Sequence, residues 1–188
     1  MLAIDVSTSM LAEDLKPNRL EAAKDVAAEF INGRPNDNIG ITLFAGETFT
    51  QCPLTVDHAV LLDMIHNIKC GLITDGTAVG MGIANAVTRL KDSKAKSKVI
   101  ILLTDGTNNK GDISPMTAAE IAKSFGIRVY TIGVGTNGMA PYPYPVGNTV
   151  QYVSMPVEID EKTLTEIAGT TDGNYFRATS NSKLKEVY

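Results

Sequence analysis

Three oxygen-bearing side chains alternate near the start of the chain, directly after an apolar segment. The opening stretch MLAIDVSTSM places Asp5, Ser7 and Ser9 at every second position. Side chains at alternate positions of an extended segment point the same way, so these three are expected to converge on one point. The convergence of one carboxylate and two hydroxyls indicates a site for a cation.

Two later stretches supply matching groups. The apolar run VIILL ends in Thr-Asp-Gly-Thr, which places Asp105 at the end of a strand. The same quartet recurs at residues 74–77, where Thr77 precedes a helix-like segment. Binding sites in α/β sheets lie at the carboxyl ends of strands, so these stretches are expected to face one crevice. The candidate metal ligands are therefore Asp5, Ser7, Ser9, Thr77 and Asp105.

This ligand set contains only oxygen donors. It suits a hard cation such as magnesium, with about six oxygens at roughly 2.1 Å, or manganese, and it disfavours zinc and copper; calcium remains an option. Two carboxylates neutralise the charge of a divalent ion but add no excess negative charge. An ion held mainly by neutral hydroxyls therefore stays electrophilic and can accept an external carboxylate. Asp75 and Asn108 adjoin the set, either as outer groups of the site or as loop and capping residues.

Alternating helical and strand-like patterns position these residues. Helical spacing of apolar residues begins near residues 20, 58 and 78. Asp57 is expected to cap the second of these helices, and Ser114 and Asp160 are expected to cap two further helices. Strand-like stretches lie between these helices. Two of the predicted strands follow each other directly, and Pro53 is expected to end the second of them. The apolar run at residues 99–103 suits the middle of a sheet. This order predicts an α/β fold with a doubly wound, mostly parallel central sheet and helices on both faces.

The segment at residues 138–157 interrupts this alternation. It contains four prolines and no helical period, and we expect an elaborated loop or an irregular hairpin on the rim of the sheet. Its tyrosines, Tyr142, Tyr144 and Tyr152, either anchor a partner or pack onto the sheet of their own domain. The chain begins inside a strand pattern, and its last stretch, SNSKLKEVY, stops inside a helical one. We therefore expect a domain excised from a longer, membrane-anchored protein.

The composition argues against several function classes. A chain of 188 residues is the size of one domain, and its net charge is −4. The basic stretch at residues 91–98 lacks interleaved aromatic residues, which favours a solvated loop over a nucleic-acid surface. No run of about 18 apolar residues occurs, so this chain itself is not expected to span a membrane. Cys52 and Cys70 form no CxxC motif, so no zinc or redox site is indicated.

Two superficial motifs are better explained as structure. The stretch GVGTNG fits a dinucleotide-binding pattern, but three prolines follow where the phosphate-binding helix should begin, so no nucleotide is expected. No small-molecule substrate is expected either, since the expected partner is a protein. His58 and His66 lie eight residues apart on one predicted helix and are interpreted as surface or structural residues.

The chain carries three motifs in this order: Asp-x-Ser-x-Ser, a loop threonine and a strand-terminal Thr-Asp-Gly. Together they resemble the metal-ion-dependent adhesion site (MIDAS) of von Willebrand factor A (VWA) domains. The resemblance covers residues 1–188 and implies a Rossmann-like fold that holds magnesium. It implies Ser7, Ser9 and Thr77 as direct ligands, with Asp5 and Asp105 acting directly or through water. A glutamate or aspartate of a protein partner would complete the coordination.

Four stretches are also similar to the bacterial aerotolerance protein BatA family: FAGETFTQCPLTVD, TDGTNNKGDISP, GTNGMAPYP and MPVEIDEKTLTEIA. This similarity implies attachment to the bacterial inner membrane through segments outside this chain, with a periplasmic position as one option. It also implies an assembly with related VWA or envelope proteins.

The expected function is therefore metal-dependent protein binding rather than catalysis. The alternative is a magnesium-dependent hydrolase of the aspartate-nucleophile phosphatase type. Enzymes of that type carry an Asp-x-Asp motif, whereas here Ser7 stands where the second aspartate would be. No G-x-S-x-G motif or P-loop is visible either.

Overall fold

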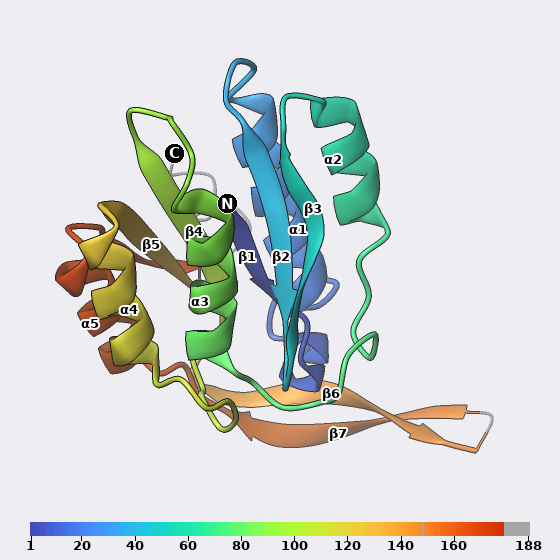
Figure 1. Ribbon diagram of the computed structural model, residues 1–188. Helices are drawn as coiled ribbons and strands as arrows, with labels where there is room; N and C mark the ends of the chain where they lie inside the picture. Colours follow the sequence, from blue (N-terminus) through green and yellow to red (C-terminus); the bar gives the residue numbers. More distant parts are fainter. Residues whose placement is uncertain (148, 179–188) are drawn as a thin grey trace.

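The computed structural model describes residues 1–147 and 149–178, which form a six-stranded sheet and a separate two-stranded ribbon (Figure 1). The strands are β1 (Leu2–Asp5), β2 (Ile39–Phe44), β3 (Thr48–Thr55), β4 (Lys98–Thr104), β5 (Ile127–Val134), β6 (Gly138–Val146), β7 (Thr149–Val157) and β8 (Tyr175–Ala178). The helices are the 3-10 turn η1 (Thr8–Leu11), α1 (Arg19–Asn32), α2 (His58–His66), α3 (Val79–Leu90), α4 (Pro115–Ser124) and α5 (Glu161–Thr170).

The central sheet has the strand order β3-β2-β1-β4-β5-β8. All neighbouring strands are parallel except β3, which runs antiparallel to β2 at one edge. Helices α1 and α2 cover one face, and α3, α4 and α5 cover the other (Figure 1). The predicted doubly wound, mostly parallel α/β fold is therefore confirmed.

Strand β4 lies in the middle of this sheet, between β1 and β5, as its apolar run predicts. Its side chains alternate between the two cores: Ile101 and Leu103 pack with α1 and α2, whereas Ile100 and Leu102 pack with α3, α4 and α5. A strand buried on both faces needs apolar residues at every position. Because β1 and β4 are parallel neighbours, their carboxyl ends lie side by side.

The helix boundaries agree with the sequence signals. Asp57, Ser114 and Asp160 precede α2, α4 and α5, and each side chain accepts a hydrogen bond from a backbone N–H three residues later. None of the helices in the described residues is long and apolar enough to cross a membrane. The helical pattern expected within SNSKLKEVY lies in residues 179–188, outside the part of the chain that the structure describes.

The prediction that Pro53 ends a strand is wrong, because β3 continues to Thr55. The pairing of β2 with β3 shifts register here: Ile39 pairs with Thr55, whereas Ile41 pairs with Cys52. Proline is tolerated at such an irregularity on an edge strand, where its missing N–H breaks no ladder hydrogen bond.

The segment at residues 138–157 forms an antiparallel hairpin, β6–β7, with nine paired positions. It runs along the edge of the sheet where β1 and β4 end and projects beyond β2 and β3 (Figure 1). Its base is fixed to the domain, because Ala140 is buried and the Glu13 N–H donates to the Pro141 carbonyl at 2.9 Å. We refer to β6 and β7 together as the ribbon.

Candidate metal site

All five predicted ligands lie at the carboxyl edge of the central sheet. Asp5 is the last residue of β1, Ser7 and Ser9 belong to the turn that enters and forms η1, Asp105 follows β4, and Thr77 lies two residues before α3. Four of the five side chains are buried, and that of Ser9 is half-buried. The adjacent ends of β1 and β4 therefore bring together groups that are 100 residues apart in the chain.

The two serine hydroxyls lie side by side. Ser7 Oγ is 2.9 Å from Ser9 Oγ, and the Ser7 N–H donates to Asp5 Oδ1 at 2.9 Å. Neighbouring ligands of an octahedral magnesium ion, at roughly 2.1 Å from the metal, are separated by about 3.0 Å. The spacing of the two hydroxyls therefore fits adjacent coordination positions.

The two carboxylates of the site are both buried, and the charge of one affects the other. Burial, followed by the negative charge of Asp105, raises the pKa of Asp5 to about 7. Asp5 Oδ2 also accepts a hydrogen bond of 2.6 Å from Thr104 Oγ1. Two buried carboxylates repel each other, and a cation between them would remove that repulsion. The electrostatics of the described residues therefore suit a cation.

A buried arginine, which the sequence analysis did not single out, binds one of these carboxylates. Arg19 donates from Nη1 to Asp105 Oδ2 at 3.2 Å, and from Nε and Nη2 to the two carboxylate oxygens of Asp14 at 2.8 Å each. The Arg19 side chain is only 1% exposed. Its sequence position, at the start of a helix and 86 residues from Asp105, carries no local signal of this contact.

Asp14 links this ion pair to the base of the ribbon. Its Oδ2 accepts hydrogen bonds from the Thr136 N–H at 2.6 Å and from Thr136 Oγ1 at 3.1 Å. Burial by itself would raise the pKa of Asp14, but hydrogen bonds from Arg19 and Thr136 and the positive charge of Arg19 hold it below its ordinary value. Asp105, Arg19, Asp14 and Thr136 thus form one continuous polar chain.

The Thr77 hydroxyl is available for a ligand. The side chain is buried, and within the described residues this hydroxyl has no hydrogen-bond partner. The Thr77 backbone is held at both ends, since its N–H donates to Asn109 Oδ1 at 2.9 Å and its carbonyl accepts from the Asn109 and Lys110 N–H groups. No hydrogen bond joins its side chain to the other four predicted ligands in the part of the chain described.

Asp75 and Asn108 hold the surrounding loops in place. Asp75 accepts from the N–H and the hydroxyl of Thr8, at 3.0 and 2.8 Å, and so ties the loop before α3 to η1. Asn108 Oδ1 accepts from the Val79 N–H at 2.9 Å, at the first turn of α3. Of the two options that the sequence left open, these contacts match loop structure and helix capping.

Glycine permits the close approach of α3 to the loop after β4. A Cβ atom at Gly80 would lie 2.1 Å from the Ile113 carbonyl oxygen, so no larger residue fits there without movement. Gly106, directly after Asp105, has a φ of +87°, a conformation that side-chain-bearing residues rarely adopt. Both glycines therefore help to place the segments that carry Thr77 and Asp105.

In residues 1–147 and 149–178, no group of three or more His, Cys, Asp or Glu side chains is arranged to hold a metal. Cys70 lies near the site and donates from Sγ to the Ser7 carbonyl at 3.3 Å. Burial, with nearby carboxylates, raises its pKa to about 12, so the thiol stays protonated.

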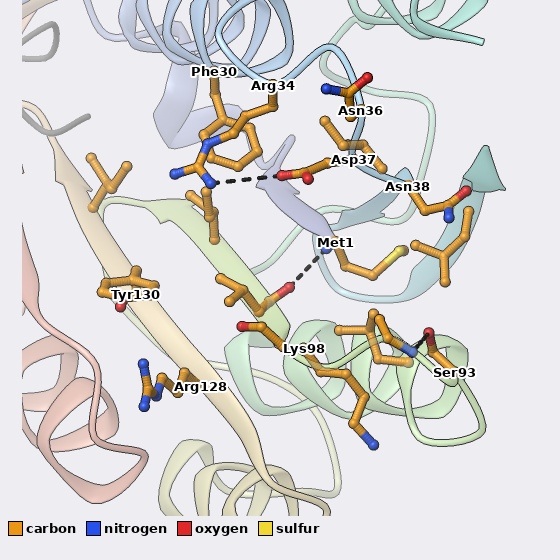
Figure 2. A pocket seen from close by; sticks show the side chains of 18 of the residues that line it. Met1, Phe30, Arg34, Asn36, Asp37, Asn38, Ser93, Lys98, Arg128 and Tyr130 are labelled. Carbon is orange, nitrogen blue, oxygen red and sulfur yellow. Dashed lines mark hydrogen bonds and ion pairs between the residues drawn. The ribbon is translucent and has the colours of Figure 1, made fainter. Parts of the chain in front are cut away.

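A cavity of about 630 Å³ lies at the opposite, amino-terminal edge of the sheet. Figure 2 shows it between the starts of β1, β4 and β5, with Phe30, Arg34 and Tyr130 among its lining residues. Arg34 is paired there with Asp37 at 3.6 Å. None of the five predicted ligands lines this cavity. A second cavity, of about 500 Å³, adjoins the candidate site at Thr107, Asn108 and the segment before α5.

Comparison with known families identifies the domain type. The family model for the von Willebrand factor type A domain matches residues 1–188. A UPF0353 protein from Mycolicibacterium paratuberculosis is 33% identical over 204 aligned positions, which cover 100% of this chain and 57% of the relative. The chain spans about half the length of the curated relatives it matches.

Solved structures agree with this result. An aerotolerance-related membrane protein from Bacteroides fragilis is 34% identical with a TM-score of 0.87, and 100% of this chain and 94% of that chain are covered. BatB from Bacteroides thetaiotaomicron is 34% identical with a TM-score of 0.88, covering 99% and 93%. The predicted resemblance to VWA domains and to aerotolerance proteins is confirmed.

A mussel byssus protein, proximal thread matrix protein 1, has been described with a zinc-occupied MIDAS motif. Its TM-score is 0.72 at 23% identity, covering 99% of this chain and 42% of that chain, so this likeness concerns the fold alone.

Proposed function

Because the chain belongs to the von Willebrand factor type A domain family, we propose that it is a metal-ion-dependent protein-interaction domain. In this proposal, a magnesium or manganese ion at the candidate site accepts a glutamate or aspartate carboxylate from a protein partner. The observation that carries the proposal is the Ser7–Ser9 hydroxyl pair, 2.9 Å apart, beside two buried carboxylates at the carboxyl edge of the sheet.

The chain supplies five oxygen ligands for such an ion. The hydroxyls of Ser7, Ser9 and Thr77 are the proposed direct ligands, and Asp5 and Asp105 bind directly or through water. When bound, the ion supplies an electrophilic centre for an external carboxylate. The hydrogen bonds from the Ser7 N–H and Thr104 Oγ1 orient the Asp5 carboxylate, and Arg19 fixes Asp105.

An aspartate-nucleophile hydrolase is a poorer explanation of the same residues. Asp5 is fully buried, and both of its carboxylate oxygens accept hydrogen bonds, from the Ser7 N–H and from Thr104 Oγ1. A carboxylate nucleophile must be within reach of its substrate. The Asp5 side chain is 0% exposed, which supports binding over catalysis.

The similarity to aerotolerance-related membrane proteins supports a more specific setting. In this proposal, the domain is held at the bacterial inner membrane by segments outside this chain, with the periplasmic side as one option, and acts in a stress-related assembly with VWA or envelope proteins. Tyr144 and Tyr152 on the neighbouring ribbon are 57% and 61% exposed, so they are accessible for partner selection.

Calorimetric titration of the purified domain with magnesium, manganese and calcium tests the metal site. We expect magnesium or manganese to bind, and the Ser9→Ala variant to lose at least tenfold in affinity because it lacks one hydroxyl ligand. Acetate, as a surrogate for the partner carboxylate, should bind only when the metal is present.

Ser97→Ala is the matched control, since Ser97 is exposed in a loop at the opposite edge of the sheet. It should bind metal as the unmodified domain does. Equal metal affinity in Ser9→Ala and Ser97→Ala would refute the proposed ligand set, and metal binding without metal-dependent acetate binding would refute the proposed carboxylate recognition.

A further inference from the structure

The ribbon exposes apolar side chains and carries no charge. Residues 138–157 include no Asp, Glu, Lys, Arg or His. Seven of their large apolar side chains are exposed: Met139, Tyr144, Val146, Val150, Tyr152, Val153 and Met155. Natural proteins usually protect exposed edge strands with charged side chains, especially lysine, or with proline. In the ribbon only proline is available for this purpose.

Proline protects the outer edge of β6. Pro141, Pro143 and Pro145 alternate along this strand and pair with Ser154, Tyr152 and Val150 of β7. In an antiparallel pair, residues that bond across the ladder alternate with residues whose N–H and C=O groups point outward. Proline has no N–H, so these three occupy outward-pointing positions. The hydrogen bond from the Glu13 N–H to the Pro141 carbonyl agrees with this orientation.

The outer edge of β7 has the opposite character. Four positions of β7 point outward: Pro156, near the base of the ribbon, and Val150, Tyr152 and Ser154, which face the three prolines of β6. Pro156 has no N–H, but the other three each have one, and in the described part of the chain none of these three residues' outward groups has a hydrogen-bond partner. Figure 1 shows β7 near the base of the ribbon on the side that faces away from the sheet and its helices, and the two strands cross nearer the tip. The β6 edge is therefore blocked by proline, and the β7 edge is open to strand pairing from Val150 to Ser154.

We propose that the outer edge of β7 pairs with the same edge of a second copy of this chain. The two strands run antiparallel about a twofold axis and form a four-stranded sheet in the order β6-β7-β7-β6. All three outward residues that carry an N–H are used in both copies when Tyr152 lies opposite Tyr152 of the second copy. Val150 then lies opposite Ser154 of the second copy.

The chemistry of this edge favours a second copy as the occupant. Two uncharged edges meet without repulsion, and the backbone groups of Val150 and Ser154 can exchange hydrogen bonds with their counterparts. The Tyr152 side chain lies near Glu13 but is 61% exposed, so it can meet its counterpart in a cross-strand aromatic pair. At the base of the ribbon, β6 lies between β7 and the rest of the domain, so the domain does not cover the β7 edge there (Figure 1).

A lipid surface suits this edge less well. Unpaired backbone N–H and C=O groups are strongly unfavourable in hydrocarbon, where water cannot satisfy them. The ribbon also lacks the Lys and Arg side chains that attract anionic headgroups.

Sedimentation equilibrium of the purified domain tests the proposal. We expect a monomer–dimer equilibrium that persists with a metal chelator, because the interface contains no predicted metal ligand. The double variant V150P/S154P removes two outward N–H donors without removing a hydrogen bond inside the ribbon, as the natural prolines of β6 do. Its dimer dissociation constant should rise at least tenfold.

Tyr144→Ser is the matched control, since it removes an exposed aromatic side chain of the ribbon but leaves the β7 edge intact. It should dimerise as the unmodified domain does. A domain that stays monomeric at several hundred micromolar, or an undiminished dimer in V150P/S154P, would overturn the proposal. The metal titration described above measures binding at the candidate metal site and not at the β7 edge. The failure of one proposal can therefore be distinguished from the failure of the other.

Disulfide cross-linking tests the register. In a Cys70→Ser background, Tyr152→Cys places two thiols opposite each other at the twofold axis, where paired Cα atoms lie about 5.5 Å apart, within the range of a disulfide. We expect a covalent dimer on mild oxidation. Val150→Cys is the matched control, because its counterpart is displaced along the strand. Equal cross-linking of the two variants would refute the proposed pairing.

Discussion

At the carboxyl edge of the sheet, the candidate metal site buries four of its five side chains in a polar network, whereas the adjacent ribbon exposes seven large apolar side chains. The site is bonded to the domain from several directions, through Thr104, Arg19, Asn109 and Asp75. The ribbon is tied mainly at its base, through Ala140 and Pro141. The fold therefore fixes the candidate site through contacts from several segments and leaves most of the ribbon exposed.

Replacing the buried arginine should have the largest effect. Arg19→Met leaves Asp14 and Asp105 buried without their cation, and removing one partner of a buried ion pair typically costs about 3–5 kcal/mol. Urea unfolding measures the loss. Arg34→Met is the matched control: the Arg34 side chain is 54% exposed, and its pairing with Asp37 is worth less than about 1 kcal/mol. Equal losses in the two variants would show that the polar network does not stabilise the site.

Removing the Thr104 hydroxyl should have an intermediate effect. Thr104 Oγ1 donates to Asp5 and accepts from the Gly106 N–H at 3.0 Å, so Thr104→Val leaves buried groups unpaired at a cost of about 1–3 kcal/mol. The same unfolding measurement applies. The control Thr88→Val removes an exposed helix hydroxyl that donates to the Ala84 carbonyl, and it should stay within about 0.5 kcal/mol of the unmodified domain.

The pH dependence of stability should depend on Asp14. Its pKa is lower in the folded domain than the ordinary value of 3.8, so the unfolded chain binds the proton more readily. The stabilisation is therefore fully present above the unfolded pKa and is lost as the pH falls through the lower folded pKa. We measure the free energy of unfolding with urea between about pH 5 and pH 2.5. As the pH falls, it should decrease less steeply in Asp14→Asn than in the unmodified domain. An unchanged slope would contradict the role of the Arg19 and Thr136 contacts.

Substitution near the tip of the ribbon should have the smallest effect. Tyr144→Ser and Val146→Ser change exposed side chains on β6, and surface changes of this kind usually stay within about 0.5 kcal/mol. Thermal unfolding at low protein concentration, where dimers dissociate, is the measurement. A loss above 1 kcal/mol, beyond the range of about 0.5 for surface sites, would show that the ribbon is part of the folded core.

The sequence predicted the framework of the candidate site because its signals are local. The run that forms β4, the alternation of Asp5, Ser7 and Ser9, and the caps Asp57, Ser114 and Asp160 are each visible within a few residues. The positions of the five predicted ligands at one edge then follow from parallel strand topology. Whether these five residues bind metal remains a prediction that the titration tests.

Other features of the site were not predictable in this way. Arg19 has the local context of any residue at the start of an amphipathic helix, and only the packing of α1 brings it to Asp105. Asn109 supports Thr77 across 32 residues, and no spacing rule links them. The continuation of β3 past Pro53 depends on its place at the edge of the sheet, which the local sequence does not encode.

By itself, the sequence determined the α/β class, the element order and the oxygen-rich turns, because hydrophobic periodicity, capping and alternation act over a few residues. Only the tertiary structure decided that Arg19 is buried between two carboxylates and that the two edges of the ribbon differ. Those properties depend on contacts between distant segments and on which backbone groups remain unpaired after folding. Neither is a property of any short stretch of the chain.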